Sequence, residues 1–186
     1  MAEARRSPLQ DRLPWALPEG GIFLAEQRFL RQIELRLRIR GAYLAGLPFP
    51  LEPNRVAAMG AVRNLWMAPD QYLLTAPEGT APELAARLAR AIAGQHASLL
   101  DLSSSRTAIE VSGTHARVLL EKGCGLDLHP RAFPPGHCAQ TLLARAPIIL
   151  DQLDAAPTYR IFVRASFARY LCDWLIDAAE EFRFTS

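Results

Sequence analysis

A strict alternation of apolar and polar residues runs through positions 31–40, where the chain reads RQIELRLRIR. Alternation with a period of two predicts a β-strand that buries one face. The buried face would carry Ile33, Leu35, Leu37 and Ile39. The polar face would carry Gln32, Glu34, Arg36, Arg38 and Arg40. Its three arginines repel one another unless acidic groups lie across the sheet or the face binds an anion or a partner. The sequence leaves both interpretations open.

Further strands and their turns follow from similar patterns. Residues 62–77 predict two strands joined by the turn pair Pro69–Asp70, because both residue types favour turns. Shorter apolar runs predict strands at 97–104 and 106–113, two strands bent at Ala146–Pro147 within 139–153, and a last strand at 158–165.

Three segments have the periodicity of amphipathic helices. Residues 80–94 place apolar side chains at helical spacing, and Thr80 with Glu83 is expected to form a capping box at the start of this helix. The other helices are predicted at 114–123 and 167–182.

The order of these elements predicts the fold class. It runs β-β-β-α-β and then β-α-β-β-β-α, without the regular βαβ alternation of a doubly wound sheet. We therefore expect an α+β protein of two intertwined ferredoxin-like halves, with antiparallel sheets and helices on one face of each. Residues 1–20 are proline-rich and are expected to form an extended N-terminal arm, and residues 21–186 a single pseudo-duplicated domain. Trp15 and Leu17 are large apolar side chains for a free tail, so the arm is expected to lie on its own domain or on a partner.

Composition narrows the classes of function. The chain has 186 residues, half of them hydrophobic, and a formal net charge of +2 from 21 basic and 19 acidic residues. Lys122 is the only lysine, so arginine supplies nearly all positive charge. A balanced charge without a basic run argues against a nucleic-acid partner. Neither a long apolar run nor a signal peptide is present, so we expect a cytoplasmic protein with reduced thiols and no membrane partner.

Two cysteines and two histidines lie within residues 122–141, KGCGLDLHPRAFPPGHCAQT. Structural zinc ligands usually come in pairs two to four residues apart. Here Cys124 and His129 are followed by the adjacent pair His137 and Cys138, and adjacent side chains of an extended chain point to opposite faces. Cys124 follows a predicted helix end, where the helix dipole raises a thiol pKa. We therefore predict neither a metal site nor a nucleophilic thiol.

Other catalytic patterns are missing from the sequence. Cys172 falls within a helix beside Leu171 and is expected to be a packing residue. The serines at 103–105 lack a G-x-S-x-G context, and no glycine-rich phosphate motif occurs. The residues alone predict no catalytic, cofactor-binding or metal-binding residue, and indicate a subunit or a binding module.

Three segments nevertheless resemble a known family. They are residues 64–74 (NLWMAPDQYLL), residues 101–150 (from DLSSSRTAIEVSG to LLARAPIIL) and residues 166–182 (SFARYLCDWLIDAAEEF). Together they resemble the gamma subunits of heterotetrameric sarcosine oxidases over about residues 30–182. The most specific part is residues 127–143, DLHPRAFPPGHCAQTLL. The first segment and the start of the second are also similar to the glycine-cleavage aminomethyltransferase and its folate-binding relatives.

The resemblance implies a fold similar to the folate-binding domain of the aminomethyltransferase and a structural role without catalysis. Complexes of this family oxidise sarcosine to glycine and yield hydrogen peroxide with formaldehyde or, from tetrahydrofolate, methylene-tetrahydrofolate. The resemblance implies that FAD, FMN, NAD and tetrahydrofolate are held by other subunits. The expected partners are the larger alpha and beta subunits and a small delta subunit.

Only a few residues carry over from the family's motifs. Four positions match the two broader motifs and are expected to maintain the fold: Trp66, Asp70, Arg106 and Gly113. The most specific motif implies a candidate docking loop for partner subunits, made of His129, Pro130, Phe133, Pro134 and Gly136. A loop with purely intramolecular contacts stays an alternative.

Two other functions also stay open. The chain could be an independent folate-binding or aminomethyltransferase-like module, which would need a pocket with a carboxylate facing the pterin and normally a longer chain. It could instead be an adaptor in a related complex that oxidises another N-methyl amine.

Overall fold

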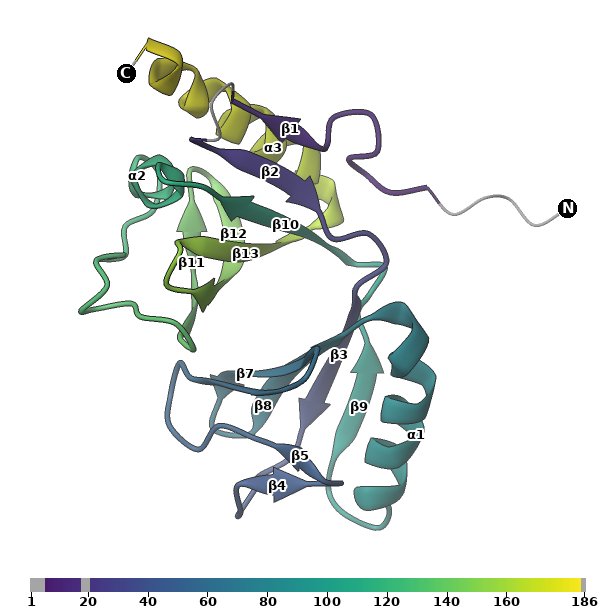
Figure 1. The fold of residues 1–186 in the computed structure, drawn as a ribbon. Coiled ribbons are helices and arrows are strands. Elements are labelled where there is room, and N and C mark those ends of the chain that lie inside the picture. The colour runs from purple at the N-terminus through teal and green to yellow at the C-terminus, as the bar shows by residue number, and fades with distance from the viewer. Residues whose placement is uncertain (1–5, 18–20, 185–186) are drawn as a thin grey trace, which may run out of the picture. The chain divides into compact units, whose positions relative to one another are not determined.

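The computed structural model describes residues 6–17 and 21–184 and divides the chain into two compact units (Figure 1). Unit 1 comprises residues 1–28, 107–135 and 140–186, and unit 2 comprises residues 29–106 and 136–139. Each unit therefore combines segments that are far apart in the sequence. This interleaving is the feature expected of two intertwined halves.

Unit 2 is built on a five-stranded sheet with the strand order β6-β7-β8-β3-β9. Its elements in chain order are β3 (Arg31–Arg36), β4 (Tyr43–Leu44), β5 (Leu47–Pro48), β6 (Val56–Met59), β7 (Val62–Ala68), β8 (Gln71–Ala76), the 3-10 helix η2 (Glu78–Thr80), α1 (Ala81–Ala91) and β9 (Ser98–Asp101). All four neighbouring pairs of the sheet are antiparallel. The predicted turn at Pro69–Asp70 joins β7 to β8, as expected.

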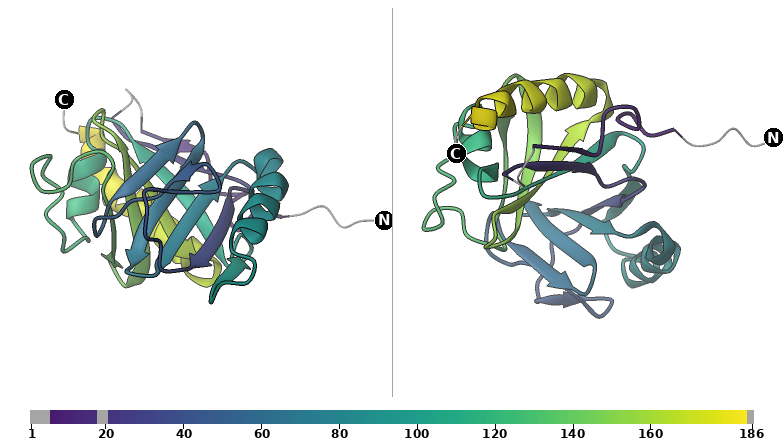
Figure 2. Two further views of the ribbon diagram at one scale, coloured as in Figure 1. Left: turned by 90° about the horizontal axis from the view of Figure 1, so that it is seen from below. Right: turned by 45° about the horizontal axis from the view of Figure 1, so that its top comes forward.

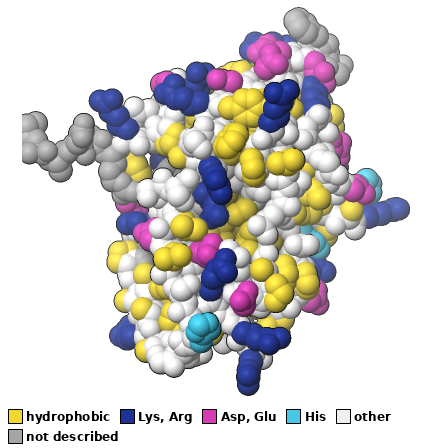
Figure 3. Space-filling model, turned by 180° about the vertical axis from the view of Figure 1, so that it is seen from behind, with side chains coloured by type: hydrophobic (Ala, Val, Ile, Leu, Met, Phe, Trp, Pro, Cys, Tyr) yellow, Lys and Arg dark blue, Asp and Glu magenta, His cyan; other side chains and the backbone are white. Residues whose placement is uncertain are grey.

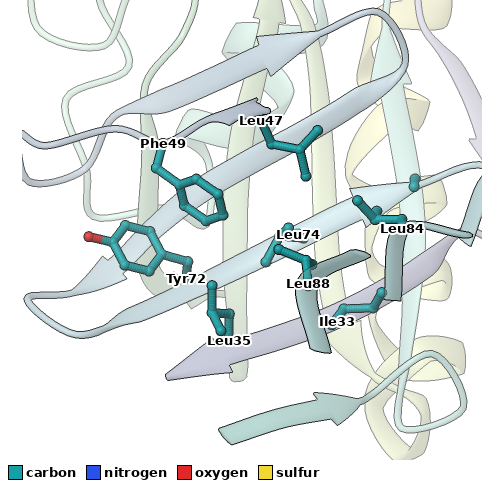
Figure 4. Close-up of a cluster of buried hydrophobic side chains, with 9 residues drawn as sticks. Ile33, Leu35, Leu47, Phe49, Tyr72, Leu74, Leu84 and Leu88 are labelled. Atoms are coloured by element: carbon teal, nitrogen blue, oxygen red, sulfur yellow. The ribbon is translucent and has the colours of Figure 1, made fainter. Parts of the chain in front are cut away.

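One buried cluster connects α1 to the sheet of unit 2 (Figure 4). Its members are Ile33, Leu35, Leu47, Phe49, Tyr72, Leu74, Ala76, Leu84 and Leu88. Leu84 and Leu88 of α1 lie over the sheet, and the rings of Phe49 and Tyr72 meet edge to face with centroids 5.2 Å apart. Helix and sheet are thus stabilised by a shared apolar interface.

Unit 1 is built on a six-stranded sheet with the order β1-β2-β10-β13-β12-β11. Its elements are β1 (Trp15–Ala16), β2 (Phe23–Glu26), β10 (Arg106–Ser112), α2 (Ala116–Glu121), β11 (Cys138–Leu143), β12 (Ala146–Asp154), β13 (Thr158–Arg164), α3 (Ala165–Ala179) and the 3-10 helix η3 (Glu180–Phe184). The first residues of both β10 and β11 are assigned to unit 2.

Helix α3 runs across one face of the six-stranded sheet (Figure 2). It buries Ala168, Leu171, Cys172, Leu175 and Ala179. These positions recur at helical spacing, so the apolar stripe seen in the sequence is the face that packs. The predicted α+β class, with mostly antiparallel pairing, is confirmed.

The N-terminal segment packs on unit 1 over its described residues. Leu9, Leu13 and Leu17 are buried, and β1 pairs with β2. Asp11 forms an ion pair with Arg169 of α3 at 3.0 Å. Residues 1–5 and 18–20 of the predicted arm lie outside the described residues. The division into an arm of residues 1–20 and one domain of residues 21–186 stays a prediction.

Strand β3 is shorter than the sequence pattern predicts. It ends at Arg36, because its partner β8 begins at Gln71, directly opposite. Beyond this point the Leu37 amide donates to the carbonyl of Asp70, at 2.9 Å. Gln32, assigned to the polar face, is also buried, and its side-chain amide donates to the Arg106 carbonyl at 3.2 Å.

The predicted capping box at Thr80 and Glu83 is wrong. Thr80 already has helical dihedrals, φ −95° and ψ −13°, because it ends the 3-10 turn η2. Its hydroxyl donates back to the Pro77 carbonyl at 3.0 Å and caps no amide of α1. A preceding turn that runs directly into the helix leaves the threonine outside the extended conformation that an N-cap needs.

Candidate functional site

The candidate docking loop connects α2 to β11. Helix α2 ends in a tight turn, in which the Cys124 amide donates to the Leu120 carbonyl at 2.9 Å. Cys124 then pairs with Leu143 as an isolated antiparallel bridge, which brings the start of the loop beside the end of β11. The sequence correctly predicted a helix end before Cys124, and the strand that it predicted from residue 139 begins at Cys138.

Local hydrogen bonds centred on His129 shape the loop. The Asp127 carboxylate accepts from the His129 amide at 2.9 Å, and His129 Nδ1 accepts from the Arg131 amide at 3.2 Å. The His129 carbonyl accepts from the amides of Ala132 at 2.8 Å and Phe133 at 2.9 Å. Because Nδ1 is an acceptor, the neutral imidazole carries its proton on Nε2. The motif D-L-H-P-R-A-F therefore encodes a compact turn.

The loop combines buried apolar anchors with exposed polar groups. Leu128 and Phe133 are buried, with 1% and 6% of their surface exposed. Its exposed residues include Asp127, His129, Pro130, Arg131, Ala132 and Pro135. Buried anchors and three fixed proline φ angles limit the loop's conformations. The arrangement presents a shaped, polar surface that needs little ordering on contact with a partner.

The end of the loop, from Gly136 on, belongs to unit 2 and pairs with residues 54–56 of that unit. Gly136 has φ +80°, a left-handed conformation that favours glycine. Its carbonyl accepts from the Val56 amide at 2.8 Å, and the Cys138 amide donates to the Asn54 carbonyl at 2.9 Å. Gly136 thus provides the backbone conformation with which the loop turns back toward β11. Pro130 and His129 instead form part of the exposed surface of the loop.

The cysteines and histidines of the loop have separate surroundings. Cys138 Sγ lies 3.5 Å from the carbonyl oxygens of Arg55 and Trp66. His137 Nδ1 lies 3.3 Å from an Arg55 guanidinium nitrogen. Within residues 6–17 and 21–184, no three His, Cys, Asp or Glu side chains are grouped as metal ligands.

All three thiols are buried. Burial, with a smaller contribution from the Asp173 carboxylate, raises the pKa of Cys172 to about 11. The Cys172 thiol is therefore protonated at neutral pH and is a poor nucleophile.

We expect native protein to resist thiol reagents. With a disulfide reagent at pH 8, the native chain should react much more slowly than unfolded chain, in which all three cysteines react. A Ser104→Cys variant provides the positive control, because Ser104 is exposed. Rapid reaction of a native wild-type thiol, at the rate of Ser104→Cys, would contradict this prediction.

The other motif residues contact the surrounding fold. Trp66 packs against the cluster of unit 2, and Asp70 accepts from the Leu37 amide through its carbonyl. Burial, and then the charge of Asp70, raises the pKa of Tyr72. The Arg106 carbonyl accepts from Gln32, while Gly113 has φ +112° and its carbonyl accepts from the Ala116 amide as α2 begins. These contacts are of the kind expected for residues that maintain a fold.

Sequence reasoning missed one surface feature of unit 2. The exposed Tyr43 lies in the same surface depression as Arg38 and Arg40. The arginine alternation was visible in the sequence, but no pattern indicated that Tyr43 and Gln95 lie beside it.

No helix among the described residues has the length and apolar character needed to cross a membrane.

Comparisons with known proteins agree with the family resemblance that the loop motif indicated. The model of the sarcosine oxidase, gamma subunit family matches residues 41–181. Sarcosine oxidase subunit gamma of Corynebacterium sp. (strain P-1) is 37% identical over 190 residues, covering 96% of this chain and 91% of that protein. The corresponding protein of Arthrobacter sp. is 34% identical, with the same coverage of both chains.

Solved structures agree with this relationship. A chain of heterotetrameric sarcosine oxidase from Corynebacterium sp. U-96, in complex with pyrrole 2-carboxylate, matches with a TM-score of 0.88 and 33% identity, covering 97% of both chains. The aminomethyltransferase of the glycine cleavage system from Bartonella henselae matches with a TM-score of 0.62 and 16% identity, over 88% of this chain and 46% of that chain. The second match concerns the fold alone and agrees with the predicted aminomethyltransferase-like architecture. The family model and the relatives together show that this chain belongs to the sarcosine oxidase gamma subunit family.

Proposed function

We propose that this chain is the non-catalytic gamma subunit of a heterotetrameric sarcosine oxidase. The assembled enzyme would oxidatively demethylate sarcosine to glycine and release hydrogen peroxide with formaldehyde or methylene-tetrahydrofolate. The observation that carries the proposal is the match over 97% of both chains to a component of such a heterotetramer. A match over nearly all of both chains supports a subunit with the same place in an assembly.

The chemistry would belong to the other subunits. FAD, FMN, NAD and tetrahydrofolate would be held by the larger alpha and beta chains, and a small delta chain would complete the cytoplasmic assembly. The buried thiols and the raised pKa of Cys172 support a structural role for this chain, because its cysteines are held as packing groups.

The candidate docking loop would contribute one contact with the partners. Its support is geometric: His129 organises the turn through its Nδ1 atom and its carbonyl, and Phe133 anchors it. A loop already ordered before contact loses little conformational entropy on docking. His129 and Pro130 would touch a partner, while Phe133, Pro134 and Gly136 would hold the loop's shape.

The assembly test is co-expression of the tagged chain with the larger subunits of a sarcosine oxidase. The tagged chain should co-purify with flavin-bearing chains and with sarcosine oxidase activity. The tagged chain purified alone should have neither bound flavin nor activity. His129→Ala should weaken retention in the complex about tenfold, because it removes the imidazole that accepts from Arg131. Arg145→Ala is the control, since Arg145 is an exposed turn residue outside the loop. A lone chain that oxidises sarcosine would overturn the proposal.

The folate-binding alternative makes a different prediction. The chain spans less than half of the aminomethyltransferase that it matches, at 46% of that chain. Titration of the purified chain with tetrahydrofolate distinguishes the two functions. Micromolar binding without co-purifying subunits would favour an independent folate-binding module.

A further inference from the structure

A groove lies where the sheet of unit 2 ends beyond β3. It consists of two surface depressions of about 550 and 470 Å³, which share Leu37 and Arg38 and therefore lie side by side. The first is lined by Arg36, Asp70 and His96 among others, and the second by Arg40, Tyr43 and Gln95. We call this surface the arginine groove. Figure 3 shows one face of the protein on which basic and acidic side chains lie close to a histidine.

The backbone directs the side chains of Arg38 and Arg40 toward the surface. The alternation of the sequence continues past the end of β3, and Leu37 and Ile39 pack against the buried cluster of unit 2. Arg38 and Arg40, on the opposite side of this segment, are exposed. The apolar packing beneath them thus sets the backbone positions from which the two guanidinium groups project.

The charges of the groove are unevenly balanced. Arg36 has an internal partner, because its Nε lies 3.2 Å from Glu34 Oε1 and its Nη2 donates to Gln71 at 3.3 Å. Among the described residues, Arg38 and Arg40 have neither an ion pair nor a hydrogen bond. Among the residues that the structure describes, Asp70 is the one carboxylate that lines the groove. The sequence allowed acidic neighbours as one explanation of the arginine-rich strand face. In the structure, such a neighbour pairs with Arg36 but not with Arg38 or Arg40.

Tyr43 adds an aromatic group beside the unpaired arginines. It is 70% exposed, more than any other large hydrophobic side chain in the described part of the chain. Arginine and tyrosine are the residue types enriched at the centres of protein interfaces. Two arginines and one tyrosine form a small patch and lack the long basic stripe with stacking aromatics that single-stranded nucleic acid requires.

We propose that the arginine groove docks an extended, acidic segment of a partner subunit in the complex. Carboxylates of that segment would pair with Arg38 and Arg40, and an apolar or aliphatic part of it would cover Tyr43. Guanidinium groups bind carboxylates in a bidentate geometry, which gives the contact a defined register. The inference rests on the proposed function, since it needs the assembled oxidase.

The first experiment uses charge reversal in the co-expressed complex. Arg38→Glu combined with Arg40→Glu should release this chain from the complex roughly a hundredfold more readily, as measured by native mass spectrometry across a salt series. Each single variant should show a smaller loss. Arg145→Glu is the matched control, because it reverses an exposed arginine of unit 1 outside the groove.

The second experiment identifies the occupant of the groove. Tyr43→benzoylphenylalanine, photo-activated in the assembled complex, should cross-link to a peptide of another subunit that contains at least two aspartates or glutamates. Cross-linking to a peptide without acids, to a second copy of this chain or to nucleic acid would overturn the proposal.

The two proposals fail in distinguishable ways. If wild-type chain does not co-purify with larger subunits, the proposed function fails. If wild-type chain co-purifies and the double arginine variant is retained as firmly as Arg145→Glu, only the arginine-groove inference is overturned. Circular dichroism of each variant verifies that the fold is kept, and the cross-link decides the question independently of stability.

Discussion

Replacing Leu88 with alanine is expected to lower the free energy of unfolding by about 3 kcal/mol. Leu88 is fully buried and lies on the inner face of α1, within the cluster that joins this helix to the sheet of unit 2. The substitution removes apolar contacts and leaves a cavity that the packed strands beneath cannot fill completely. Because α1 contributes few other buried side chains, the helix should loosen from the sheet.

Urea unfolding followed by tryptophan fluorescence measures this effect. Trp66 packs against the same cluster and reports on its surroundings. Leu100→Ala is the matched control, because the same side chain is 52% exposed there and should cost less than about 1 kcal/mol. Equal unfolding midpoints for the two variants would refute the assignment of Leu88 to the core.

Gly123→Ala is expected to destabilise unit 1 by about 1–3 kcal/mol. A Cβ atom at Gly123 would lie 2.6 Å from Cζ2 and Cη2 of Trp174, and 3.1 Å from the backbone nitrogen of Ala144. The indole is rigid and the other contact is backbone, so neither neighbour can yield by a simple side-chain rotation. The turn that follows α2 would have to move away from α3.

A double-mutant cycle tests the cause of this cost. In a Trp174→Phe background, the smaller ring removes the clash, and Gly123→Ala should then cost clearly less than in the wild type. Gly125→Ala is the control, since a Cβ atom there would meet no atom within 4 Å. An equal cost in both backgrounds would show that the close approach of Trp174 is not responsible.

The candidate docking loop and the arginine groove differ in how well the sequence predicts them. The loop was recognisable because D-L-H-P-R-A-F-P-P-G fixes its own turn through bonds between near neighbours, as His129 shows. The arginine groove was only half recognisable. The alternation of apolar and polar residues predicted that Arg38 and Arg40 share one face. That Tyr43 and Gln95 lie beside them depends on tertiary contacts, which the pattern does not contain.

The sequence by itself determined the strands with clear periodicity, the three helices, the α+β class and the family. These features depend on local patterns: a period of two, a period of 3.6, turn residues and a specific motif. Short strands such as β1 and β4 have two residues each, too few to show a period.

Tertiary structure decided the remaining features. Strand β3 ends at Arg36 because β8 begins opposite, and Gln32 is buried because the Arg106 carbonyl satisfies it. The Leu9 side chain is buried in unit 1, whereas the sequence left open whether the N-terminal segment packs on its own domain or on a partner. Each depends on which distant segment supplies a hydrogen-bond partner or an apolar surface. Local propensity cannot contain that information, because burial and pairing are properties of the assembled chain.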